Sequence, residues 1–308
     1  MRVKFSHSLN CRQFCIFAGL LAQVVIGESC LQAQSFDWTK FVPNPGRANQ
    51  IGAIPFLKEI SPEELEQLEA VEISTREERT HGKQILLEAE NKLARRRIRV
   101  SRQSRDVTYL QKLVATARPL MDNRDRYPSI RIGIIEADFE DAYSIPGGDL
   151  LFTRGLLEKC ESEAAMVGVV CHELAHLDRG HQLYRLRKAK LASQSKNWLK
   201  KMNGLASSFM PFHPEFEKQA DMDAVRHMLA LKYDPKEFAH LLERWEQKQN
   251  QQSPWLDVMP PQMRSHPDAG VRVESVLAEY GKFHGDARQL RIGRENFKRR
   301  IPCNERTF

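Results

Sequence analysis

The stretch His172-Glu173-Leu174-Ala175-His176 places two imidazoles and one carboxylate at the spacing of a metal-binding helix. Residues four apart on an α-helix lie on one face, about one turn apart, so both imidazoles can reach a single ion. Glu173 lies beside them, where its carboxylate can take a proton from metal-bound water. The sequence therefore predicts a helix that binds one zinc ion per chain. The alternative is a pair of core histidines satisfied by hydrogen bonds.

The residues around this stretch predict that the helix is buried. From Ala164 to Leu177 nearly every position outside the motif is apolar, and a helix that is apolar on almost every side belongs in a protein core. Ser162 is placed to cap the N-terminus of this helix, and Glu163 lies in its first turn, where a carboxylate is favoured. Buried imidazoles and carboxylates need partners, so further polar groups are expected beside the motif.

The positions that a three-histidine zinc site would use carry other residues. Arg179 and Gln182 stand where that pattern requires a glycine and a histidine. His181 is the next histidine along the chain. On a continuing helix it would lie about half a turn from His172, either beside the metal ligands or at the surface. The third ligand is therefore expected elsewhere.

A second helix, beginning at Pro214, supplies the candidate. Its apolar stripe is formed by Ala220, Ala224, Met228 and Leu231. Glu217 lies on the same stripe, and a carboxylate on an apolar face needs a cation, so Glu217 is predicted as the third zinc ligand. Asp221, one turn later, suits a carboxylate that orients a ligand imidazole. The alternative is an amphipathic helix on which Glu217 pairs with a lysine or an arginine.

The chain before the metal helix predicts helices followed by a small sheet. Helices are expected from 61, over 75–97 and over 105–118, and strands over 130–135, 141–145 and 149–153. Pro146-Gly147-Gly148 joins the last two strands and is a strong turn signal. The predicted fold class is α+β, mainly helical, with a small β-sheet beside the zinc-binding helix.

The first 35 residues differ from the rest of the chain. Basic residues precede the apolar run 14–27, which is too short for a comfortable membrane span and is typical of a signal peptide. Cleavage is expected after Ser29 or after Ser35. Lipidation at Cys30 and an uncleaved membrane anchor are the alternatives. The sequence predicts an exported protein, periplasmic or extracellular, with membrane association as a further option.

Charge and cysteine content exclude two other classes of protein. The formal net charge is +7, but the basic residues are spread through the chain without a nucleic-acid-binding motif, so no nucleic acid is expected as a partner. The cysteines beyond the signal region are Cys160, Cys171 and Cys303, an odd set that forms no disulfide framework. The basic segment 185–201 has no acidic residue. It is interpreted as a solvated basic helix or as a contact with an anionic membrane surface.

Taken together, these motifs resemble the HtpX-like and CAAX-prenyl-protease zinc metallopeptidase family, and within it the exported BepA-like branch. The matching segments, within residues 70–285, are 142–148 with 153–157, His172 to His176 with His181, 217–221, and 265–267 with Arg272. The resemblance implies a gluzincin-type site with zinc on His172, His176 and Glu217. It also implies Glu173 as general base and Asp221 as a supporting acid sometimes described as a proton donor.

Composition and the resemblance together predict four segments: a signal peptide and the start of a lead-in at 1–35, an extended lead-in rich in proline and glycine at 36–60, a zinc metallopeptidase domain at 61–285 and a tail at 286–308. The tail is too short for the tetratricopeptide array of the BepA-like proteins. In those relatives a loop histidine at the position of His266 can cover the metal. His266 is accordingly expected to act as a regulatory or fourth ligand, or else to mark a simple junction before Pro267.

The expected activity is that of an exported zinc endopeptidase acting on unfolded or misassembled envelope proteins. The strand beside Pro146, Gly147 and Gly148 is expected to hold an extended polypeptide substrate by backbone pairing. The alternative is a chaperone or assembly factor that binds client proteins and whose proteolysis is latent or regulated.

Overall fold

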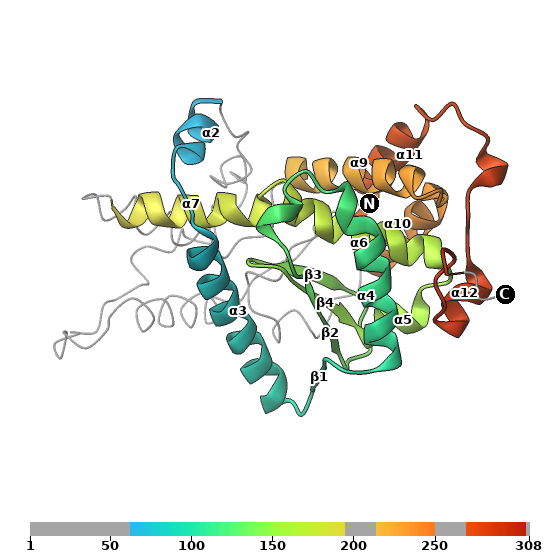
Figure 1. Ribbon diagram of the computed structural model, residues 1–308, viewed down its shortest axis with the longest axis horizontal. Helices are drawn as coiled ribbons and strands as arrows, with labels where there is room; N and C mark the ends of the chain where they lie inside the picture. The colour runs from blue at the N-terminus through green and yellow to red at the C-terminus, as the bar shows by residue number, and fades with distance from the viewer. Residues whose placement is uncertain (1–61, 195–213, 250–268, 306–308) are drawn as a thin grey trace, which may run out of the picture. The chain divides into compact units, whose positions relative to one another are not determined.

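The computed structural model describes residues 62–194, 214–249 and 269–305, which are mainly helical around a small sheet (Figure 1). Within these residues the sheet has the strand order β1 (Val100–Ser101), β2 (Arg131–Ile135), β4 (Asp149–Thr153) and β3 (Ala142–Ile145). β2 runs parallel to β4, and the β1–β2 and β3–β4 pairs are antiparallel. The predicted α+β, mainly helical class and the three predicted strands are confirmed. β1 was not predicted, because two residues are too short to show alternation.

The chain divides into two units, and the unit Met1–Lys58 lies outside the described residues. The expected signal peptide and its cleavage sites fall in this unit, and the whole lead-in at 36–60 likewise lies outside the described residues. Within the described residues, no helix is both long enough and apolar enough to cross a membrane.

The two faces of the sheet are covered by different helices. Alternate side chains of β2 and β4, such as Ile134 and Phe152, join one hydrophobic core with α4 (Arg105–Ala117) and α6 (Glu163–Asp178). The intervening side chains, such as Leu151, pack with the buried stripe of α3 (Thr75–Arg95). Because side chains alternate between the faces of a strand, each strand contributes to both layers. Both faces of the central strands are therefore buried.

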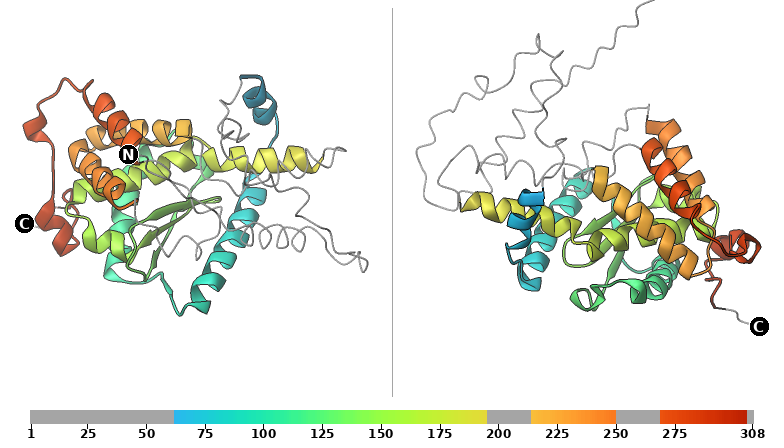
Figure 2. Two further views of the ribbon diagram at one scale, coloured as in Figure 1. Left: turned by 180° about the vertical axis from the view of Figure 1, so that it is seen from behind. Right: turned by 90° about the horizontal axis from the view of Figure 1, so that it is seen from above.

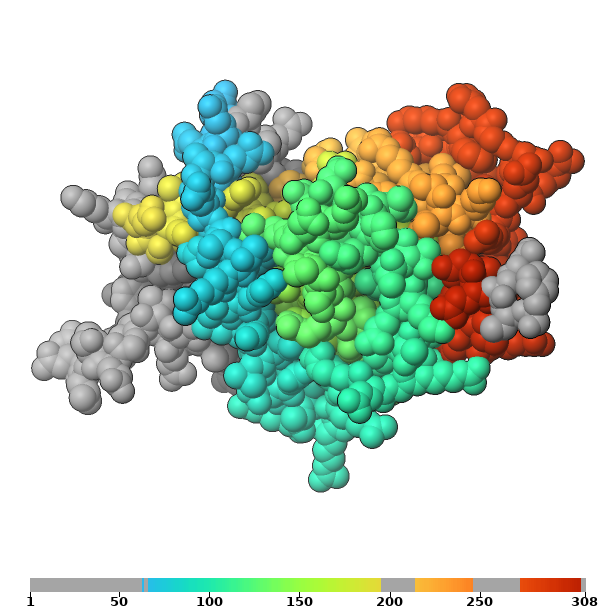
Figure 3. All heavy atoms as spheres, viewed as in Figure 1, coloured from blue at the N-terminus to red at the C-terminus, as the bar shows by residue number. Residues whose placement is uncertain are grey.

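Local signals in the sequence set the ends of α3 and of the hairpin. Ser74 and Glu77 form a capping box, in which each side chain accepts a hydrogen bond from the other residue's backbone. The turn between β3 and β4 uses Gly147 and Gly148, with φ values of 87° and 92° that glycine adopts without strain. The amide of Gly147 donates to the buried carboxylate of Glu78 at 3.0 Å. The hairpin turn is thereby fixed against α3, and the atoms of α3 adjoin those of the hairpin in the space-filling view (Figure 3).

The remaining helices lie mostly in the second half of the chain. Their bounds are α2 (Pro62–Glu69), α5 (Arg154–Lys159), α7 (His181–Ser193), α9 (Pro214–Ala230), α10 (Pro235–Gln249), α11 (Ala269–Tyr280) and α12 (Arg294–Arg299), with short 3₁₀ helices at Arg118–Leu120, Arg124–Arg126 and Ala287–Gln289. α9 and α10 both pack against α6, and α11 packs on α9 and α10. Two further views show this helical layer on the side of α6 away from α3 (Figure 2).

The segment that the sequence sets apart as a tail packs against the start of α6. The carbonyl oxygen of Ile292 accepts a hydrogen bond from the amide of Ala164 at 3.0 Å. The amide of Cys303 donates to the buried carboxylate of Glu163 at 2.7 Å, which also accepts from the hydroxyl groups of Tyr109 and Tyr233. A carboxylate with three donors is well placed in the first turn of a helix. The C-terminal residues thus help to fix the metal helix.

The tight contact between α3 and the hairpin predicts a large effect at Gly82. A Cβ atom at this position would lie 1.7 Å from the carbonyl oxygen of Pro146. Alanine favours a helix over glycine by up to about 1 kcal/mol, but overpacking against backbone costs about 1–3 kcal/mol and occasionally more. We therefore expect Gly82→Ala to lower the free energy of unfolding in urea. In Gly281→Ala the nearest atoms are 3.4 Å away, and this control should be neutral. A Gly82→Ala protein as stable as the control would contradict this packing.

Candidate metal centre

α6 and α9 bring together the three residues that the sequence predicts as metal ligands. Nε2 of His172 lies 3.0 Å from Nε2 of His176, one turn further along α6. The carboxylate of Glu217, on α9, lies 3.5 Å from Nε2 of His172 and 3.4 Å from Nε2 of His176. All three side chains are almost fully buried. Ala220 and Ala224, fully buried on α9, let that helix approach α6 closely.

The geometry of this cluster fits a zinc ion. Nitrogen and oxygen ligands bind zinc at about 2.0–2.2 Å, so ligand atoms in a tetrahedral site stand about 3.3–3.5 Å apart. The separations of 3.4 and 3.5 Å agree with that spacing, and the Nε2–Nε2 separation of 3.0 Å is a few tenths of an ångström shorter. Two imidazoles and one carboxylate are also the donor set of catalytic zinc sites, which keep a fourth position open for water or substrate. The residues present therefore fit the metal that the motif predicts.

Asp221 holds the ring of the first ligand. Its Oδ1 lies 2.8 Å from Nδ1 of His172. A hydrogen bond from Nδ1–H to this oxygen leaves the lone pair of Nε2 directed toward Glu217 and His176. This is the position from which the sequence expects Asp221 to orient an imidazole.

Arg272, on α11, holds Asp221 in turn. Its Nε and Nη2 donate to the two oxygens of Asp221 at 2.9 and 2.8 Å. Burial favours the neutral acid, but the charge of Arg272 and the hydrogen bonds from His172 and Arg272 hold the pKa of Asp221 below its ordinary value. Asp221 therefore stays a carboxylate. In the sequence, Arg272 was marked only by the family resemblance.

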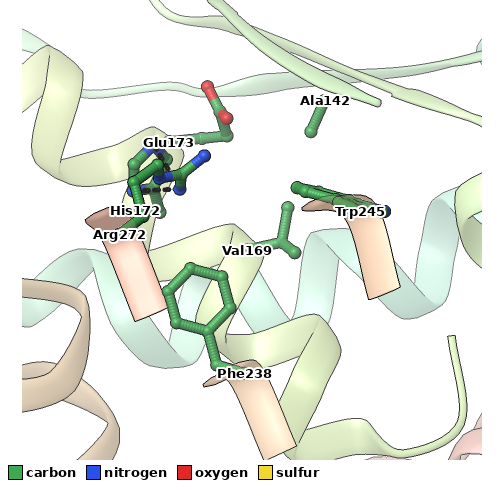
Figure 4. Close-up of a pocket in the computed structure, with 7 residues that line it drawn as sticks. All are labelled: Ala142, Val169, His172, Glu173, Phe238, Trp245 and Arg272. Carbon is green, nitrogen blue, oxygen red and sulfur yellow. Dashed lines mark hydrogen bonds between the residues drawn. The ribbon is translucent and has the colours of Figure 1, made fainter. Parts of the chain in front are cut away.

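Glu173 lies in a pocket beside the cluster (Figure 4). The pocket is lined by Ala142, Val169, His172, Glu173, Phe238, Trp245 and Arg272. Its polar groups, on α6 and α11, face an apolar wall to which α10 contributes Phe238 and Trp245. A buried carboxylate in a pocket that also contains a metal ligand is placed as a general base requires. Phe238 and Trp245 are seven residues apart, about two turns, and therefore lie on the same face of α10. That spacing was the signal in the sequence that could have identified them.

The structure corrects the expected course of the chain at His181. The metal helix does not continue to this residue, because Gly180 adopts the left-handed conformation with φ 68° and α7 begins at His181. The break turns the ring of His181 inward, where it is 2% exposed and its Nδ1 lies 2.9 Å from Nδ1 of His176. Burial lowers the pKa of His181 to about 4, so the ring is neutral at pH 7. The surface alternative for His181 is wrong, because the ring lies beside His176, one of the three predicted ligands.

Two other expectations concern His266 and the turn formed by Pro146, Gly147 and Gly148. His266 lies outside the described residues, so its role stays a prediction. Pro146, Gly147 and Gly148 are not among the residues that line the pocket, and the turn is packed against α3 instead. The hairpin residue that does line the pocket is Ala142, at the far end of β3 from the turn. The predicted role of the strand beside Pro146, Gly147 and Gly148 in holding substrate stays a prediction.

The basic segment 185–201 is described as far as 194, and this part is not a freely solvated helix. Arg185 is buried, and Nε of Arg187 donates to the carbonyl oxygen of Val71 at 3.0 Å. Nζ of Lys190 pairs with Glu77 at 2.7 Å. These cations are used in packing α7 against the region of α2 and α3, so the interpretation as a solvated helix is wrong for them. Contact of the segment with an anionic membrane stays a prediction.

The buried Asp221–Arg272 pair predicts a sharp difference between two aspartates on α9. In Asp221→Asn the guanidinium group of Arg272 loses the carboxylate that it contacts at 2.8 Å and keeps Glu217, 3.6 Å away. We expect a loss of about 3–5 kcal/mol in the free energy of unfolding of the metal-free protein and zinc affinity weaker by about 10–100-fold. Asp223→Asn changes a partly exposed pair with Arg179 and should cost about 0–1 kcal/mol. Chemical unfolding and zinc competition with a chelator measure both, and equal losses in the two variants would contradict the assignment.

Comparison with known proteins agrees with this geometry. The model of Peptidase family M48 matches residues 111–280, which is more than half of the 308 residues. The matched region runs from α4 to the end of α11 and contains the cluster, Glu173, Asp221 and Arg272. No curated protein matches the chain. The chain belongs to Peptidase family M48, a family of metallopeptidases.

Proposed function

We propose that this protein is an exported zinc endopeptidase that hydrolyses peptide bonds in unfolded or misassembled envelope proteins. The observation that carries the proposal is the convergence of His172, His176 and Glu217 at zinc-ligand spacing, next to a pocket that contains Glu173. A binding protein without hydrolytic activity would not need a buried carboxylate at that position.

In this proposal the roles of the chain's own residues follow from their contacts. His172, His176 and Glu217 hold the ion, which when bound acts as a Lewis acid and lowers the pKa of water. Glu173 accepts a proton from the attacking water at its carboxylate and delivers it to the nitrogen of the leaving amine. Asp221 does not line the pocket and is kept ionised by Arg272. We therefore propose that Asp221 orients the ring of His172 and does not act as a proton donor.

The substrate class follows from the pocket and from the sheet. Within the described residues β3 is an edge strand, and its Ala142 end lines the pocket. An edge strand can pair with the backbone of an extended peptide, a mode that depends little on sequence. Val169, Phe238 and Trp245 offer an apolar surface to a neighbouring side chain. These features support an unfolded polypeptide as the substrate. The choice of envelope proteins is supported by the signal-like segment alone.

Two substitutions separate hydrolysis from metal binding. Glu173→Gln keeps the three ligands, so we expect one zinc per chain by mass spectrometry and cleavage of an unfolded substrate slower by about 10²–10⁴-fold. Glu217→Ala removes a ligand and should lose both zinc and activity, whereas Glu274→Ala, exposed on α11, should change neither. Equal cleavage by wild type and Glu173→Gln at equal zinc content would refute the assigned base. Absence of cleavage by every form, with client binding retained, would favour the chaperone alternative.

Removal of the metal tests the same site without a substitution. Treatment with a strong chelator should abolish cleavage, and one equivalent of zinc should restore it, because apo protein lacks the Lewis acid. Ligand binding to the folded state should also raise the melting temperature on zinc addition. A chelated protein that retains full activity would rule out metal-dependent hydrolysis.

Export has its own test. The mature protein, expressed in its native host, is expected in an envelope or extracellular fraction with its first residue at Cys30 or Phe36, as judged by mass spectrometry of the N-terminal peptide. An intact chain beginning at Met1 and confined to the cytosol would refute the export proposal and leave the peptidase proposal standing.

A further inference from the structure

The Nδ1 atoms of the two predicted histidine ligands, His172 and His176, face different kinds of side chain. Nδ1 of His172 faces a carboxylate, that of Asp221, at 2.8 Å. Nδ1 of His176 faces another imidazole, that of His181, at 2.9 Å. Ligand imidazoles ordinarily donate their second N–H to a carboxylate, a backbone carbonyl or water. The partner of His176 is therefore the unusual one.

Only one arrangement of protons lets both rings serve the metal site. Nε2 of His176 faces Glu217 at 3.4 Å and must keep its lone pair free for the ion, so the proton of this neutral ring lies on Nδ1. Nδ1 of His181 must then accept that proton's hydrogen bond. The N–H of His181 is consequently on Nε2, which lies 3.3 Å from Oε1 of Gln219. A chain of two hydrogen bonds thus runs from His176 through His181 to Gln219.

The surrounding structure fixes the ring of His181. It stacks on Phe216 with ring centres 4.4 Å apart and planes 8° from parallel. Gly180, in the left-handed conformation, caps the N-terminus of α7 immediately before His181. If α6 continued through this position, the side chain of His181 would point in another direction. Phe216 and Gln219 flank Glu217 on α9. The residues that hold His181 therefore come from the same helix as the third ligand.

A neutral acceptor also suits the charge of the site. Glu173, Glu217 and Asp221 are already buried there. Two buried arginines face them: Arg272 contacts Asp221 and lies 3.6 Å from Glu217, and the charge of Arg185 also acts on Glu217. A further carboxylate behind His176 would have to be desolvated as well, and the desolvation of a charged group is costly. An imidazole accepts the hydrogen bond without that cost.

We propose that His181 is a positioning residue that sets the tautomer and direction of His176, and that Gln219 sets the tautomer of His181. This inference rests on the proposed metal-binding role of His176. If His181 and Gln219 act in this way, α7 and the amide of Gln219 contribute to the affinity for the metal in addition to the three ligands.

The test compares a replacement of His181 that lacks the hydrogen-bond acceptor with one that keeps it. His181→Phe keeps a ring that can stack on Phe216 and removes the acceptor, and we expect zinc affinity to fall by about 10–100-fold in competition with a chromophoric chelator. His181→Asn carries an oxygen near the position of Nδ1 and should bind zinc close to the wild-type level. His240→Phe, exposed on α10, is the control and should bind zinc as wild type does.

A spectroscopic readout separates positioning from general loss of structure. In ¹⁵N-labelled, zinc-loaded protein, the Nδ1 protons of His172 and His176 should both be visible and slow to exchange. His181→Phe should abolish the slow exchange for His176 and leave it for His172. If His181→Phe does not fold, Gln219→Leu keeps the test open, because it removes only the outer acceptor and should weaken zinc binding by a smaller factor.

The outcomes are distinct from those of the proposed function. If wild type binds no zinc, or if Glu217→Ala binds it fully, the proposed metal site itself fails. If wild type binds zinc and folded His181→Phe binds it equally well, the positioning role alone is overturned. Equal weakening in His181→Phe and His181→Asn would likewise overturn it, since the acceptor would then be irrelevant.

Discussion

Glu217 and Asp221 lie one turn apart on α9 and are 2% and 0% exposed, so each carboxylate depends on the polar groups packed against it. Arg272 and the ring of His172 match Asp221, while the rings of His172 and His176 face Glu217. A buried charge costs several kcal/mol unless partners compensate it. The carboxylates can therefore stay charged only when α6, α9 and α11 are packed together. The metal site and the helical layer of the fold are in this sense one structure.

The metal helix is held at both ends by carboxylates that accept hydrogen bonds from distant segments. At its start Glu163 accepts from Tyr109, Tyr233 and the amide of Cys303. At its end Asp178 accepts from the backbone amides of Asp122 and Asn123 at 3.0 and 2.6 Å. Ligands on a rigid element are held close to their productive geometry without reorganisation. The largely apolar body of α6 supplies burial, and these two carboxylates limit its movement along and about its axis.

The parts of the site that the sequence predicts are those governed by local spacing. The helix around His172 is predicted from its apolar positions. Glu217, the third predicted ligand, is found from helical periodicity and from the placement of a charge on an apolar face. The inward position of His181 depends on the conformation of Gly180, and a glycine after an arginine does not by itself decide whether a helix ends or continues. The contact of Cys303 with Glu163 joins residues 140 apart, and no local pattern marks it. Sequence periodicity thus specifies faces of elements, while the partners of those faces depend on tertiary packing.

The helix break at Gly180 links the metal site to the edge of the sheet. His181 and Gln182 follow it directly, and their side chains reach different targets: the ring of His176, and the carbonyl oxygen of Ser144 on β3 at 2.6 Å. Two neighbouring residues of α7 therefore set the distance between a metal ligand and the strand whose other end lines the pocket. Buried hydrogen bonds of this kind are costly to break. A displacement of α7 would consequently disturb His176 and the edge strand together, so the first turn of α7 couples the candidate metal site to the strand that lines the pocket.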